Sequence, residues 1–168
     1  MEDSIVLEDL PPERAIREAV VVDAPVDQVW EAWTTPEGVR SFFSPACNVE
    51  LRVDGLYEIL FDPEAPIGER GAEGMRVLAF HPKTMLAFTW NAPPHLAEVR
   101  GQLTHVLMRL RATDDGRTLV ALTHSGWGEG GEWDEAFAYF ERAWGQIVLP
   151  RLQYRFTVGP VDWDDPPR

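Results

Sequence analysis

The longest regular segment that the sequence predicts is a helix near its C-terminal end, and this helix limits how the rest of the chain can fold. From about Glu132 to Phe156, apolar residues recur every three or four positions, as they do on the buried face of a helix. Pro150 falls inside the segment and removes one backbone donor, so we predict a bend near residues 146–150. The apolar face carries Phe137, Phe140, Trp144, Ile147, Val148 and Leu152.

Segments with strand-like composition precede this helix, and short turns join most of them. The turns are expected at Asp54–Gly55, at 81–84 and at 114–117. Strands that follow one another through such short turns pair in antiparallel fashion. The expected strands cover residues 15–22, 49–51, 57–61, 74–80, 85–90, 104–113 and 118–125.

Two short helices are expected between the first two strands. Pro25 suits the first position of a helix, and the apolar residues that follow share one face. Thr35 is the expected N-cap of a second helix, which would bury Val39, Phe42 and Phe43.

This order of elements predicts an α+β fold of the helix-grip type. A curved antiparallel sheet of about six to seven strands would wrap around the C-terminal helix, because a sheet that buries one face needs a cover and no other element is long enough. We expect a hollow between sheet and helix, closed at one end by the two short helices. The chain of 168 residues is divided into an N-terminal arm (1–13), a single domain (14–157) and an acidic C-terminal tail (158–168).

The charge balance excludes several kinds of partner. The chain has 28 acidic and 15 basic residues, for a net charge of −13. Nucleic-acid backbones and anionic membrane surfaces repel such a protein, so neither is expected as a partner. No apolar run approaches the roughly 20 residues of a membrane span, and no secretion signal is recognisable. These features favour a cytoplasmic protein.

Cysteine and histidine usage gives no indication of a metal. The single cysteine, Cys47, allows neither an intrachain disulfide nor a paired-cysteine metal site, and we interpret it as a small apolar residue rather than a nucleophile. The four histidines lack the spacing of a zinc site, so no metal and no other cofactor is expected.

The segment 126–131 satisfies the glycine pattern of dinucleotide sites. Such a site also needs a second parallel strand with an acidic residue about 20 positions on, and no strand follows the C-terminal helix. Glu129, Glu132 and Asp134 would moreover repel a pyrophosphate. We therefore interpret the glycines as a flexible turn.

Two longer motifs resemble a known family. Ala24–Glu37 and His81–Trp90 resemble motifs of the SRPBCC or START-like helix-grip proteins, closest to the branch named after the C-terminal domain of the activator of the Hsp90 ATPase. The resemblance spans roughly residues 14–155 and implies the helix-grip fold. It does not imply one activity, because the scaffold hosts lipid binders, cyclases and co-chaperone domains. The chain departs from the family pattern at Phe42–Pro45 and at Ala143–Trp144, both near the expected cavity.

Aromatic residues dominate the face of the sheet that is expected to meet the helix. They form either a solid core or an apolar pocket, on the order of 300–1,000 Å³, for a small hydrophobic or aromatic ligand. The candidate ligand-binding residues are Tyr57, Phe61, Phe88, Trp90, Met108 and His124 from the sheet, with Phe140 and Trp144 from the helix.

His124 is the candidate catalytic residue. Alternation along its strand points it inward, where it is either a core histidine with a backbone partner or a group that orients a ligand or transfers a proton. Arg76 could pair with a ligand carboxylate if it also points inward, whereas Glu98 and Arg100 are expected to be exposed.

Three functions remain open from the sequence. The first is binding of a small apolar ligand, the second is a chaperone-binding module, and the third is a cyclase or hydrolase that uses His124. Unpaired sheet edges also allow a homodimer.

Overall fold

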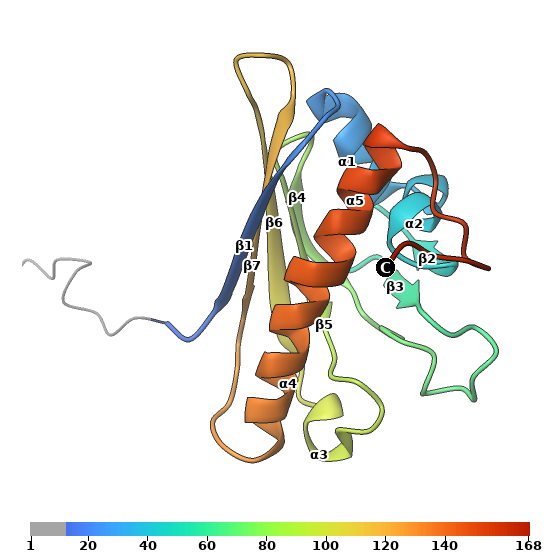
Figure 1. Cartoon of the computed structure of the whole chain (residues 1–168). Helices are drawn as coiled ribbons and strands as arrows, with labels where there is room; N and C mark the ends of the chain where they lie inside the picture. The colour runs from blue at the N-terminus through green and yellow to red at the C-terminus, as the bar shows by residue number, and fades with distance from the viewer. Residues whose placement is uncertain (1–12) are drawn as a thin grey trace, which may run out of the picture.

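The computed structural model describes residues 13–168, so nearly all of the expected N-terminal arm lies outside the described residues (Figure 1). The described part contains the predicted strands and helices, although the strand expected at 49–51 lies at Ala46–Val49 and the one expected at 74–80 begins at Val77. In chain order the elements are β1 (Ile16–Val22), α1 (Val26–Thr34), α2 (Pro36–Phe42), β2 (Ala46–Val49), β3 (Tyr57–Leu60), β4 (Val77–His81), β5 (Met85–Trp90), α3 (Ala97–Arg100), β6 (Thr104–Ala112), β7 (Thr118–Ser125), α4 (Glu132–Arg142), a π-helical segment η2 (Ala143–Val148) and α5 (Leu149–Thr157).

The strands form an antiparallel layer that confirms the predicted α+β helix-grip fold. Five strands pair in the order β1-β7-β6-β5-β4, and β2 and β3 form a separate hairpin. Isolated bridges at Leu56–Arg76 and Leu60–Gly71 continue the pairing from β4 to β3. In Figure 1 the helix from α4 to α5 runs along one face of these strands, with α1 and α2 beside α5 and α3 beside α4.

The sequence patterns that predicted α2 correspond to real contacts. The Thr35 hydroxyl accepts a hydrogen bond from the backbone N–H of Gly38 at 3.0 Å, as an N-cap does. The sequence did not predict α3, whose four residues are too few to show a helical repeat.

The irregularity predicted near Pro150 takes the form of a π-helical turn. Proline has no N–H, and its ring would collide with the carbonyl four residues back, that of Gln146. The helix widens just before it: the N–H of Leu149 bonds to the carbonyl of Trp144, five residues back. This wider turn keeps Trp144 and Val148 buried against the sheet while 44% of Ile147 stays exposed.

Aromatic side chains fill the centre of the space between sheet and helix. Trp90 of β5 lies 5.5 Å from Trp144 between ring centroids, and Phe43 stacks on Trp90 at 5.9 Å. These rings fill much of the expected hollow between sheet and helix, and the part that stays open lies beside Trp90 and Trp144.

The C-terminal residues pack onto the domain rather than extending from it. Val161 is 6% exposed, and its N–H bonds to the carbonyl of Ser41. The indole N–H of Trp163 donates to the carbonyl of Arg40 at 2.7 Å. The segment predicted as an acidic tail (158–168) thus carries two apolar anchors among its acids, and the packed body extends beyond residue 157.

Candidate functional site

An apolar pocket opens beside the filled core, between the helix and the end of β3. We call it the helix pocket, and it has a volume of about 250 Å³. Buried Trp90 and Trp144 form its inner wall, while Phe61, Tyr139 and Ile147 stand at its edge. Its full lining is Phe43, Phe61, Trp90, Tyr139, Phe140, Ala143, Trp144, Ile147, Val148 and Arg151.

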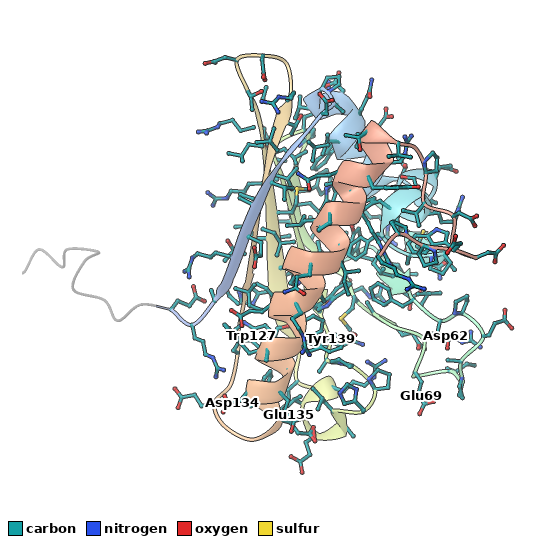
Figure 2. The ribbon with its side chains drawn as sticks, in the orientation of Figure 1. Asp62, Glu69, Trp127, Asp134, Glu135 and Tyr139 are labelled. Carbon is teal, nitrogen blue, oxygen red and sulfur yellow. The ribbon has the colours of Figure 1, made fainter. Side chains whose placement is uncertain are left out.

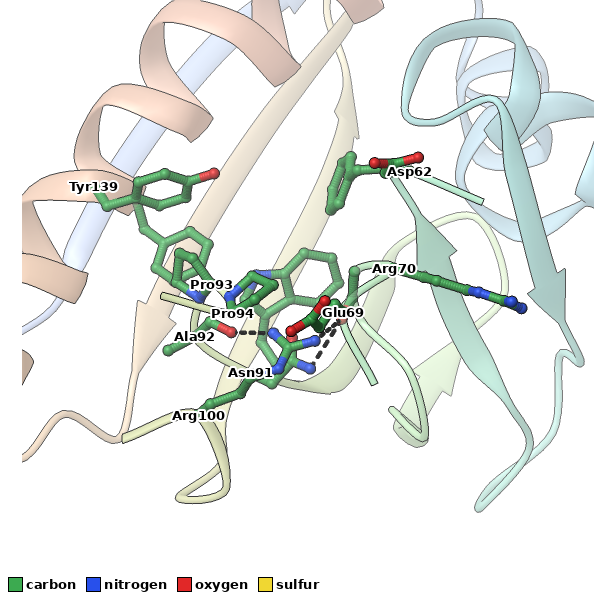
Figure 3. Close-up of a pocket in the computed structure, with 13 residues that line it drawn as sticks. Asp62, Glu69, Arg70, Asn91, Ala92, Pro93, Pro94, Arg100 and Tyr139 are labelled. Atoms are coloured by element: carbon green, nitrogen blue, oxygen red, sulfur yellow. Dashed lines mark hydrogen bonds between the residues drawn. The ribbon is translucent and has the colours of Figure 1, made fainter. Parts of the chain in front are cut away.

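A second, more polar pocket adjoins the first. This loop pocket measures about 140 Å³ and shares Phe61, Trp90, Tyr139 and Phe140 with the helix pocket. Its other walls come from the loop after β3 and the loop after β5, and Figure 3 shows Tyr139 and Asp62 on opposite sides of it. In Figure 2 the loop that carries Asp62 and Glu69 lies across from the helix that carries Tyr139.

Arg100 joins the two loops that form the loop pocket (Figure 3). Its guanidinium donates to the carbonyl of Gly68 at 2.8 Å, to that of Gly71 at 2.9 Å, and to that of Ala92. Burial lowers the pKa of Arg100, and the nearby carboxylates of Glu73 and Glu69 partly offset that effect. The sequence interpretation of Arg100 as an exposed residue is wrong, because the loops fold over it.

Four of the predicted ligand-binding residues line the helix pocket, and four do not. Phe61, Trp90, Phe140 and Trp144 come together there. The other four, Tyr57, Phe88, Met108 and His124, have no exposed surface and lie deeper in the core.

The deeper residues are covered because their neighbours fill the space above them. The Tyr57 ring packs on Phe88 with centroids 4.4 Å apart, and its hydroxyl donates to the carbonyl of Trp33 at 2.8 Å. Burial raises the pKa of Tyr57 well above its usual value. Strand alternation correctly predicts that these side chains point inward, but not that α1, α2 and the long helix cover them.

His124 is a fully bonded core residue. The indole N–H of Trp144 donates to Nδ1 at 3.0 Å, so the proton of the neutral ring lies on Nε2, which is 2.6 Å from the hydroxyl of Thr104. That hydroxyl donates onward to the carbonyl of Trp90 at 3.3 Å. Burial, with a smaller contribution from His105, lowers the pKa of His124 to about 3. The geometry favours the core interpretation: His124 fixes Trp144, a wall of the helix pocket.

Comparison with known proteins supports the family that the motifs resemble. The family model described as activator of Hsp90 ATPase homolog 1-like protein matches residues 23–156. The chain belongs to this family. No curated protein sequence is similar enough to count as a relative.

Solved structures share the fold of this family at low sequence identity. Protein MLL2253 from Mesorhizobium loti has a TM-score of 0.66 at 20% identity, over 83% of this chain and 94% of that one. The Aha1 dimer from Colwellia psychrerythraea has a TM-score of 0.65 at 18% identity, and the match covers 86% of this chain and 97% of that one. DynU16, from the dynemicin biosynthetic locus, has a TM-score of 0.64 at 23% identity. The match covers 89% of this chain but only 49% of the DynU16 chain, so this chain spans about half of that protein. At these identities the likeness establishes the fold alone.

Arg151 is a site residue that the sequence interpretation missed. Arg151 is absent from the candidate residues of the sequence analysis, yet its side chain lines the helix pocket. Its spacing was the available signal, because Arg151 follows Ile147 by four residues and Trp144 by seven, which places all three on one side of a helix.

The remaining candidates lie away from both pockets. Arg76 is exposed and donates to the carbonyl of Asp54 at 3.2 Å. The Cys47 thiol is half-buried, and burial is the main reason that its pKa is raised. Within residues 13–168, no cluster of three or more histidine, cysteine or acidic residues has the geometry to hold a metal ion. None of the helices in that range is long and apolar enough to cross a membrane.

The turn formed by residues 126–131 explains why this segment is rich in glycine. Gly126, Gly130 and Gly131 have positive φ values of 90°, 74° and 53°, which side chains disfavour. A Cβ on Gly128 would lie 2.2 Å from the indole nitrogen of Trp133. Backbone geometry and close packing therefore account for all four glycines of this segment.

Proposed function

We propose that this protein binds a small, largely apolar or aromatic ligand in the helix pocket. The observation that carries the proposal is an open pocket of about 250 Å³ walled by aromatic side chains. Concave sites with mostly apolar walls and a few polar groups are the usual ligand sites of globular proteins.

The edge of the helix pocket supports this function. Phe61, Tyr139 and Ile147 are 47%, 40% and 44% exposed around one opening. Large apolar side chains gathered at one place on a surface are typical of interaction sites. A ligand that covers them removes apolar area from water, which stabilises the complex by roughly 25 cal/mol per Å².

The size of the site limits the ligand. The helix pocket and the loop pocket share four walls, and together they reach the lower end of the roughly 300–1,000 Å³ range of small-molecule sites. This favours a compact aromatic compound of up to three rings over a long-chain lipid. The loop pocket offers hydrogen-bonding groups to one end of such a compound, whereas the helix pocket takes its apolar body.

Ile147→Trp tests this proposal, because an indole at the edge of the helix pocket would obstruct the opening. N-phenyl-naphthylamine, an uncharged probe that fluoresces in apolar sites, should bind the wild type, and Ile147→Trp should weaken its binding at least tenfold. Leu78→Trp is the matched control, since Leu78 is 46% exposed on β4, away from either pocket. Equal binding to all three proteins, or none to the wild type, would overturn the proposal.

A chaperone-binding role is the second candidate function. The observation in its favour is the match to the family named after the activator of the Hsp90 ATPase. In this role the purified protein should raise the ATPase rate of an Hsp90 from the same organism. An unchanged rate at saturating protein would reject it. Catalysis by His124 is not proposed, because both of its ring nitrogens are bonded inside the core.

A further inference from the structure

Arg151 is the one charged residue among the described residues that line the helix pocket. It lies in the first turn of α5, beside Trp144 and Ile147 of the π-helical segment. Its guanidinium carbon sits 5.5 Å from the ring centroid of Trp163, in the docked C-terminal segment. The pocket thus joins a mostly aromatic wall to a single cation.

The guanidinium of Arg151 is partly buried yet unpartnered by hydrogen bonds or ion pairs within residues 13–168. Its Nε is buried without a hydrogen-bond partner, and within residues 13–168 the side chain makes neither a hydrogen bond nor an ion pair. Arg14 and Arg117, by contrast, each pair with a carboxylate, at 3.0 and 2.9 Å. Asp165 borders an adjoining depression together with Arg151 and forms no ion pair with it. Burial alone lowers the pKa of Arg151.

A partly buried guanidinium with unused donors is a fitting partner for an anionic group. Its fork of N–H groups matches the two oxygens of a carboxylate, which is the geometry of the stronger charge-assisted hydrogen bonds. The pocket walls beside Arg151 are apolar, so they would hold the hydrocarbon part of the same molecule.

We propose that the ligand of the helix pocket is an apolar or aromatic carboxylate whose carboxyl group pairs with Arg151. This inference rests on the proposed function and narrows it to one class of ligand. The protein carries a net charge of −13, which disfavours unspecific binding of anions. A preference for a carboxylate must therefore arise from a local cation.

Two probes that differ only in charge test the inference. Naphthoate and naphthamide share the same ring system and differ in a carboxylate against an amide. Isothermal titration calorimetry at pH 7 should give naphthoate at least a tenfold lower Kd on the wild type, in keeping with the larger contribution of hydrogen bonds to charged groups. Raising the salt concentration should narrow this difference.

Variants assign the preference to Arg151. Arg151→Gln should weaken naphthoate binding roughly 10- to 100-fold and leave naphthamide almost unchanged, whereas Arg151→Lys should fall between. Arg155→Gln is the control, because Arg155 stacks on Phe156 and lies outside the helix pocket. It should bind both probes as the wild type does.

A structural role of Arg151 gives different results. If Arg151 serves only to hold the C-terminal segment, Trp163→Leu, which removes the stacked ring, should weaken naphthoate as much as Arg151→Gln does. That result would overturn the inference. Equal affinity of the wild type for both probes would also overturn it, but would leave the proposed ligand pocket intact. Failure of both probes and of the uncharged naphthylamine to bind would instead reject the pocket itself.

Discussion

The burial of His124 makes the stability of this protein fall in mild acid. His124 has no exposed surface, and its Nδ1 accepts the hydrogen bond of Trp144. Protonation of the ring would convert this acceptor into a donor that faces another donor. It would also place a charge in an apolar core. The folded protein therefore holds the imidazole neutral.

The pKa shift sets the size and direction of the effect. Folding lowers the pKa of His124 from 6.5 to about 3, so the unfolded chain binds the proton more readily between these values. The stabilisation gained by keeping the ring neutral is fully present above the pKa of His124 in the unfolded chain. It is lost as the pH falls toward the pKa of the folded protein, about 3. At about 1.4 kcal/mol per pKa unit, the loss is about 2 kcal/mol between pH 7 and pH 5 and approaches about 5 kcal/mol at the acid limit.

Urea unfolding at pH 7, 6 and 5 measures this loss. In His124→Asn the side chain cannot titrate, so the free energy of unfolding should fall by about 2 kcal/mol less than in the wild type between pH 7 and pH 5. Carboxylates contribute equally to both proteins and cancel in the difference. His81→Asn, which removes an exposed imidazole at the turn between β4 and β5, should follow the wild type. Identical pH dependence of His124→Asn and the wild type would refute the reasoning.

Two further predictions concern the walls of the site. Arg100→Met removes the donors that join the loops after β3 and β5. The free energy of unfolding in urea should fall by about 1–3 kcal/mol, and proteolysis within residues 62–74 should become faster. An unchanged rate of cleavage there would contradict this prediction. Pro150→Ala restores a backbone donor, so the π-helical segment should convert to α-helix and rotate Ile147 by roughly 100° relative to Arg151. The uncharged naphthylamine should then bind more weakly, and unaltered binding with retention of the π-helical turn would refute the assigned role of the proline.

Local sequence patterns predicted the elements because each depends on neighbours in the chain. The Thr35 cap, the turn at Asp54 with its φ of 63° and the inward direction of Tyr57 follow from three- or four-residue rules. The irregular turn before Pro150 followed in the same way, from the chemistry of one residue. The π-helical form of that turn did not, because a proline inside a helix is compatible with a kink as well as with a wider turn.

The location of the pocket did not follow from such rules. The same inward alternation that applies to Phe88 and Met108 applies to Trp90, yet only Trp90 borders an opening. Rings contributed by α2 and the long helix decide which inward residue is covered. Arg100 shows the same limit, because its exposure depends on two loops that are distant in sequence.

The amino-acid sequence thus determined the order of strands and helices, the face that each one buries and the family, since all three are written in short-range periodicity and motifs. Tertiary packing alone decided where the space between sheet and helix stays open, that His124 is bonded on both nitrogens and that Arg151 makes no hydrogen bond or ion pair within residues 13–168. These properties depend on distances between side chains that lie far apart in the chain, and no local pattern encodes such distances.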